Sequence, residues 1–195
     1  MELVDGHIWP PFEAFYIHGM LFNAQSALRS TLRISHEFEK LPEKATMDDL
    51  AALQTHSILN DLQNIIIHGA SLSRYFWPVR TGHEKRGAHL RESLEISDDN
   101  PLHSRELRNA IEHFDERLDK YLSSEIVGVI IPEYVGPKPY QNDIPGHFFR
   151  AFFTDIGVFR LLENEYEMEP IVNEILRINE SLEKAIKNGS RLPQT

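Results

Sequence analysis

Apolar residues recur at every third or fourth position along most of the chain before residue 124, which is the spacing of one face of an α-helix. This pattern predicts helices over residues 12–39, about 46–77, 83–94 and about 101–122. Cap and proline signals bound them, because Thr46 with Asp49 forms a capping pair and Asn100–Pro101 puts proline at a first helical position. Trp77–Pro78 closes the second helix.

The pattern changes after Ser124. A short β-branched run occupies residues 126–131, and two aromatic-rich runs, 147–153 and 158–162, flank a turn at Asp155–Gly157, as in a β-hairpin. Further signals are a short strand at 166–168, a last helix from Glu169–Pro170, and a proline-rich loop over 132–145. We therefore predict a mainly α fold: an antiparallel bundle of about four helices in residues 1–124, and an appendage of residues 125–195 with a small antiparallel hairpin or meander and a C-terminal helix.

Composition excludes several classes of protein. The chain has 20 Lys and Arg against 30 Asp and Glu, a net charge of −10, which argues against general adhesion to nucleic acid or to anionic membranes. It has no cysteine, so thiol catalysis, thiolate zinc sites and disulfides are excluded. No apolar run approaches the roughly 20 residues of a membrane span, and we expect a cytoplasmic protein with no membrane partner.

The fourth predicted helix has a polar face that is a candidate site. On a helical wheel its core face is formed by Leu107, Ile111, Phe114, Leu118 and Leu122. Asn109 and His113 lie opposite that face, one turn apart, and Arg108 lies on the flank. Arginine can hold a phosphate, and histidine can transfer a proton near neutral pH. Because RNA supplies its own 2′-hydroxyl nucleophile, such a site would need no metal and no cofactor.

The segment Arg108-Asn109-Ala-Ile-Glu-His113 resembles the Arg-x₄₋₆-His signature of HEPN (higher eukaryotes and prokaryotes nucleotide-binding) domains. The resemblance covers roughly residues 10–124. It implies a metal-independent ribonuclease of a toxin or defence system, which acts as a homodimer with a composite site at a two-fold interface. It also implies that Arg108 contacts the scissile phosphate, that His113 is the acid/base or its positioning partner, and that Asn109 orients them. An antitoxin or regulatory protein would be a further partner.

Two other interpretations of this face stay open. Glu112, Asp115, Glu116 and Asp119 surround the motif, and this acidity favours a non-catalytic helical module for binding or dimerisation. An ordinary solvated helix face with ion pairs is the third interpretation.

One basic zone stands out in this acidic chain. Its cations are Arg74, Arg80, Lys85, Arg86 and Arg91, and aromatic residues are interleaved with them. They predict an RNA-binding surface by phosphate contact and base stacking. The simpler interpretation, which we favour, is that Phe76 and Trp77 close the end of the bundle while the cations solvate a loop. We expect no metal site, because neither Glu-x-x-His nor His-x₃-His occurs.

Overall fold

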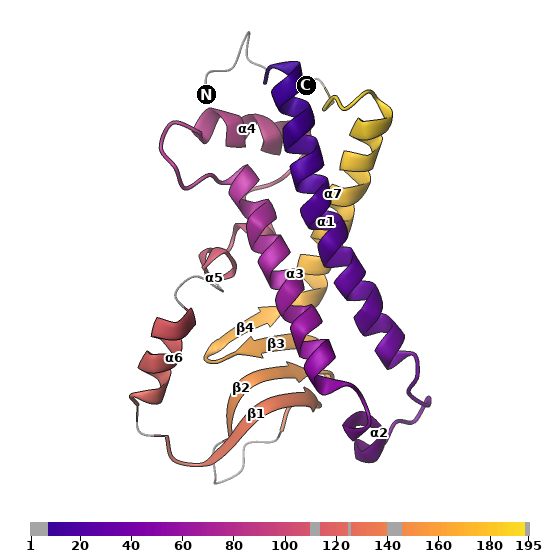
Figure 1. The fold of residues 1–195 in the computed structure, drawn as a ribbon, viewed down its shortest axis with the longest axis vertical. Helices are drawn as coiled ribbons and strands as arrows, with labels where there is room; N and C mark the ends of the chain where they lie inside the picture. Colours follow the sequence, from indigo (N-terminus) through magenta and orange to yellow (C-terminus); the bar gives the residue numbers. More distant parts are fainter. Residues whose placement is uncertain (1–7, 110–113, 125, 140–145, 194–195) are drawn as a thin grey trace. The chain divides into compact units, whose positions relative to one another are not determined.

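The structure, a computed structural model, describes residues 8–109, 114–124, 126–139 and 146–193. The chain forms two compact units that alternate along the sequence. The first, here called the helical unit, comprises the described parts of residues 1–28, 65–110 and 170–195. The second, the sheet unit, comprises those of residues 29–64 and 111–169. Two long helices, α1 and α3 (Figure 1), contribute residues to both units.

The secondary structure is mostly helical up to residue 122 and mixed thereafter. The helices are α1 (Pro10–Phe38), α2 (Met47–Ala51), α3 (Thr55–Phe76), α4 (Glu84–Ser93), the short 3₁₀ helix η1 (Pro101–His103), α5 (Arg105–Arg108), α6 (Phe114–Leu122) and α7 (Met168–Lys187). The strands are β1 (Val129–Gly136), β2 (Gly146–Phe153), β3 (Val158–Leu161) and β4 (Asn164–Glu167). Several predicted elements are confirmed: α1, the end of α3 before Trp77, α4, and the C-terminal helix α7.

Two of the predicted helices are interrupted. Thr46 and Asp49 do form a capping box, but it opens the short helix α2, and α3 begins afresh at Thr55. The predicted helix over residues 101–122 is wrong as a continuous element, because η1 and α5 precede α6 and Asn109 lies in a turn. Side-chain caps mark the separate starts of η1 and α5: the Asn100 Oδ1 accepts from the Leu102 amide at 2.9 Å, and the Ser104 hydroxyl accepts from the Leu107 amide at 3.3 Å.

The helical unit is built around a stripe on α7. Its apolar residues Ile171, Ile175, Ile178 and Leu182 are buried. Gly69 of α3 faces this stripe, because a Cβ there would lie 3.7 Å from the Ile175 side chain and 3.5 Å from that of Leu102. An added Cβ would be in ordinary van der Waals contact with both side chains, so α3 packs against α7 and η1 at this position.

The sheet unit corrects the predicted fold class. Its four strands lie in the order β1-β2-β3-β4 (Figure 1); β1 pairs with β2 in parallel, and the other neighbours are antiparallel. The predicted hairpin is present as β2 and β3, with Gly157 at φ +64° in its turn. The mainly α bundle with a small antiparallel hairpin is nevertheless wrong, because the fold is α+β with a mixed sheet.

The error has a local cause at β1. This strand continues through Pro132 into the segment predicted as a loop. Proline cannot donate a ladder hydrogen bond, so it normally argues against a strand, but β1 lies at the edge of the sheet, where proline is tolerated. Beneath the sheet, Phe148, Ala151, Phe153 and Val158 form a buried cluster with Tyr134 packed against it.

Candidate functional site

The described residues that are predicted to act on RNA all belong to the helical unit. They lie at the C-terminal end of α3, on α4 and the preceding loop, and at the end of α5. His113 lies outside the described residues.

The basic zone contains two arginines that cap α3. The Arg91 Nη1 donates to the Phe76 carbonyl at 2.6 Å, and the Arg86 Nη2 donates to the Arg74 carbonyl at 3.5 Å. Both carbonyls belong to the last turn of the helix, where they lack helical partners and carry the negative end of the helix dipole. These guanidinium groups therefore stabilise the end of α3, which is a structural role.

The cations of this zone differ in their exposure to solvent. Arg86 is buried and lies over the ring of Tyr16 at 5.2 Å. Arg74, Arg80 and Lys85 are exposed. Phe76 and Trp77 are buried, as expected if they close this end of the bundle. An RNA-binding surface here would consist of Arg74, Arg80 and Lys85, with Arg91 half-buried beside them.

His103 is an imidazole of the helical unit that the sequence analysis did not single out. Its ring stacks on Trp77 with centroids 4.2 Å apart and planes 8° apart, and the Arg91 guanidinium lies over the same indole at 5.7 Å. The His103 Nδ1 is 2.8 Å from the Asp98 carbonyl oxygen. Because a carbonyl can only accept, Nδ1 must carry the proton, and the neutral ring presents Nε2 as its basic nitrogen.

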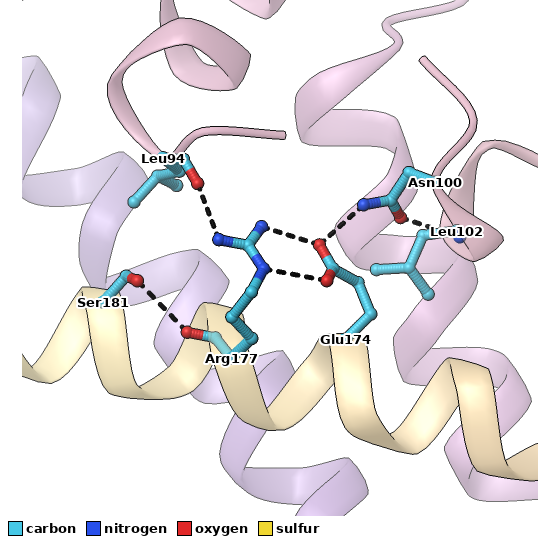
Figure 2. A network of polar contacts seen from close by, with 6 residues as sticks. All are labelled: Leu94, Asn100, Leu102, Glu174, Arg177 and Ser181. Carbon is cyan, nitrogen blue, oxygen red and sulfur yellow. Dashed lines mark hydrogen bonds and ion pairs between the residues drawn. The ribbon is translucent and has the colours of Figure 1, made fainter. Parts of the chain in front are cut away.

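A polar network holds the segment that leads to α5 (Figure 2). The Glu174 carboxylate on α7 accepts from the Asn100 Nδ2 at 2.6 Å and from the Arg177 Nη2 at 2.7 Å. Arg177 also donates to the Leu94 carbonyl at 2.9 Å. The hydrogen bonds that Arg177 donates to Glu174 raise the pKa of Arg177, so this guanidinium stays charged. Two residues of α7 thus fix both ends of an irregular segment that has little regular backbone pairing.

The motif itself is described in part. Leu107 is buried and anchors α5, as the predicted core face requires. Arg108 ends α5, but its side chain is not among those the structure describes. Asn109 is exposed in the following turn. The prediction that Asn109 lies on a helix is therefore wrong, because α5 ends at Arg108.

The sheet unit has a pocket that sequence reasoning did not find. Its volume is about 750 Å³, and it lies between the last turns of α1 and the first turns of α3. The Arg33 Nε donates to both oxygens of the buried Asp61 at 3.1 and 3.0 Å, and its Nη2 donates to the Ser30 hydroxyl at 2.9 Å. The hydrogen bond and charge of Asp61 raise the pKa of Arg33, although partial burial opposes this. No spacing signal in the sequence links the two partners.

Searches against family models, curated proteins and solved structures give no match for this chain. Within the described ranges, no helix is long and apolar enough to span a membrane. Nor do three or more His, Asp or Glu side chains come together there as candidate metal ligands.

Proposed function

We propose that the protein is a HEPN-like, metal-independent ribonuclease of a toxin or defence system that works in the cytoplasm as a homodimer. The observation that carries this proposal is the motif Arg108-Asn109-x₃-His113. In the proposed reaction the 2′-oxygen forms a bond to phosphorus and the bond to the 5′-oxygen breaks, which leaves a 2′,3′-cyclic phosphate and a 5′-hydroxyl. One imidazole accepts the 2′ proton, a conjugate acid protonates the leaving oxygen, and Arg108 stabilises the charge on the phosphate.

The surroundings of α5 support this assignment. Asn109 is exposed directly after the helix, and the segment before it is held by Asn100, Glu174 and Arg177. A site placed on a fixed segment keeps its catalytic groups oriented. His103 offers a second imidazole of defined tautomer in the same unit as Arg108. RNA would reach this corner along Arg80 and Lys85, and an antitoxin or regulatory protein would act by covering it.

The decisive experiment presents RNA to the purified protein in EDTA and analyses the ends of the products. We expect 2′,3′-cyclic phosphate ends, and we expect His113→Ala and Arg108→Ala to abolish their formation. His36→Ala is the matched control, because this exposed histidine follows Arg29 in a similar spacing on α1 without the neighbouring asparagine. Cleavage that His113→Ala leaves unchanged would contradict the proposal. Loss of cleavage in His103→Gln but not in His113→Ala would transfer the acid/base role to His103.

A second candidate function is a non-catalytic binding or dimerisation module. The observation that favours it is that Arg86 and Arg91 are used to cap α3, which leaves fewer cations for RNA. Under this alternative no RNA is cleaved, and Arg108→Ala or Asn109→Ala shifts the monomer–dimer equilibrium measured by sedimentation. A wild-type chain that sediments only as a monomer would rule it out.

A further inference from the structure

The first five turns of α1 present an exposed face without any charge. The exposed residues of α1 before position 29 are Pro10, Pro11, Phe12, Phe15, His18 and Phe22. The single charged residue of that stretch is Glu13, which is 3% exposed, accepts from the Leu192 amide at 2.6 Å and pairs with Arg191 at 2.7 Å. The solvent-exposed side chains of this part of the helix are therefore mainly aromatic, with one imidazole, which is unusual for a surface helix.

The aromatic residues of this face are well exposed. Phe15 is 79% exposed, Phe22 66%, and Phe12 44%; Trp9, just before the helix, is 51% exposed and packs edge-on against Phe12 at 5.0 Å. We call these four residues the aromatic face. A buried aromatic side chain covers roughly 150–250 Å², so the four together offer about 500 Å² per copy. Two copies would bury about 1,000 Å² through these residues alone, close to the lower limit of about 1,200 Å² for a specific interface.

The chemistry of the face selects its partner. Nucleic acid and anionic lipid both require cations, and the exposed positions of α1 before residue 29 carry no Lys or Arg. A basic protein would be drawn to the acidic remainder of a chain with net charge −10, not to its uncharged face. Two copies of that acidic chain repel one another except where both surfaces are uncharged, so a second copy fits this face.

The spacing of the face also fits two-fold symmetry. Phe15 and Phe22 lie one heptad apart on the same side of α1, and His18 lies between them near the midpoint. In an antiparallel contact between two copies of α1, each Phe15 would face the partner's Phe22, and the two His18 side chains would meet close to the axis. Phe22 also packs against α3, because its ring lies edge-on to that of His68 with the ring centroids 6.3 Å apart.

We propose that the aromatic face of α1 is the surface through which a second copy of this chain docks, with antiparallel α1 helices crossing at His18. The inference does not rest on RNA cleavage, and it names a contact other than the composite site, because none of the motif residues belongs to the aromatic face. It assigns the contact to Phe15 and Phe22, where aromatic residues at the centre of an interface contribute most of the affinity.

Sedimentation equilibrium of the full chain tests the surface. We expect the wild type to sediment at twice the chain mass, and each of Phe15→Ser and Phe22→Ser to raise the dissociation constant by at least about 30-fold. Leu176→Ser is the matched control, because Leu176 is 44% exposed on α7, as Phe12 is on α1, and its loss should leave the dimer intact. A monomeric wild type, or dimers that persist in both phenylalanine variants, would overturn the proposal.

Cross-linking tests the geometry. The chain contains no cysteine, so His18→Cys introduces a single thiol at the proposed crossing point. Mild oxidation should give a disulfide-linked dimer for His18→Cys and none for Leu176→Cys; the reverse result would overturn the antiparallel arrangement. The RNA assay on the same variants separates the two proposals. Monomeric variants that still cleave RNA contradict the composite site alone, whereas inactive wild-type dimers contradict the ribonuclease and leave the docking surface standing.

Discussion

Glu174 in the helical unit and Glu165 in the sheet unit each accept hydrogen bonds from two side chains, yet their surroundings differ. Glu174 is 12% exposed and joins Asn100 and Arg177, so it links α7 to a segment 74 residues earlier in the chain. Glu165 is 35% exposed and pairs with Arg160 directly across the β3–β4 ladder, with Lys138 at 3.4 Å. Water and salt screen the second network far more than the first. In the helical unit, a shielded carboxylate therefore fixes a segment without regular secondary structure. In the sheet unit, a solvent-screened ion pair is added to two strands that the backbone hydrogen bonds already hold together.

The largest effect should follow from breaking the shielded network. Glu174→Gln removes the charge that Arg177 and Asn100 bind, and we expect a loss of about 2 kcal/mol in the free energy of unfolding, since hydrogen bonds to charged groups contribute about 1.5–3 kcal/mol. Hydrogen exchange at the Leu102 amide should rise in the same variant. Glu183→Gln is the control on the same helix, because Glu183 is exposed and accepts a hydrogen bond from Asn179. Equal losses in the two variants would show that shielding does not matter here.

A pair with a buried carboxylate but an exposed cation should give an intermediate effect. Asp61 is 8% exposed, but its partner Arg33 is 57% exposed and can turn to water when the carboxylate is lost. We expect Asp61→Asn to cost about 1 kcal/mol in chemical denaturation. Arg33→Gln should cost more than that, because it leaves a buried carboxylate with the weaker Ser30 hydroxyl nearby. A double-mutant cycle measures the coupling, and zero coupling energy would contradict the assigned pair.

The screened network should give less than about 1 kcal/mol, with a pH dependence of defined sign. Burial alone would raise the pKa of Glu165, but the hydrogen bonds and charges of Arg160 and Lys138 outweigh burial and leave that pKa below its ordinary value. The contribution is thus fully present above the ordinary glutamate pKa of about 4.3 and is lost as pH falls through the lowered value. In Glu165→Gln, the free energy of unfolding should depend less steeply on pH between about pH 5 and pH 3 than it does in the wild type. An unchanged slope in this variant would contradict the role assigned to the pair.

How far the sequence predicts the molecule depends on whether the determining interactions are local. Helix α7 and the hairpin around Gly157 were predicted correctly, because the apolar stripe of the one and the turn residue of the other are local signals. The parallel pairing of β1 with β2 was missed, since register between strands leaves no mark in the spacing of either one. The cap at Asn100 agrees with the prediction, but the helix that it opens is the three-residue η1 and not a continuous helix to residue 122.

The candidate site shows the same limit. The motif at Arg108 is a contiguous pattern and could be found, whereas the stacking of His103 on Trp77 joins residues 26 positions apart. The roles of Arg86 and Arg91 as caps of α3 could be anticipated only in part. Cations near the C-terminal end of a helix commonly bind its last carbonyl groups. Here, however, the cations belong to the next helix, α4, and their side chains donate to carbonyls in the last turn of α3.

The smallest effect concerns a polar contact with no ionised partner, beside the aromatic face. The His68 Nδ1 lies 3.0 Å from the Asn23 Oδ1, whose amide nitrogen donates to the Gly19 carbonyl at 2.9 Å; Nδ1 is thus the protonated nitrogen of a neutral ring. Burial lowers the pKa of His68 below its ordinary value. The unfolded chain therefore takes up a proton first, so stability should fall as pH drops below about 6.5 and level off below the lowered pKa.

His68→Gln should remove that slope between about pH 7 and pH 5 in thermal unfolding, while the exposed His36→Gln should not. Because the Phe22 ring lies against His68, protonation at mildly acidic pH would also place a charge beside the proposed dimer surface. Dimer dissociation should then set in only as pH falls through the lowered pKa of folded His68, below the pH at which stability begins to fall, and it should not set in over that interval in His68→Gln. If the dissociation constant of the dimer does not change across that interval, protonation of His68 affects the stability of the fold and not the docking surface.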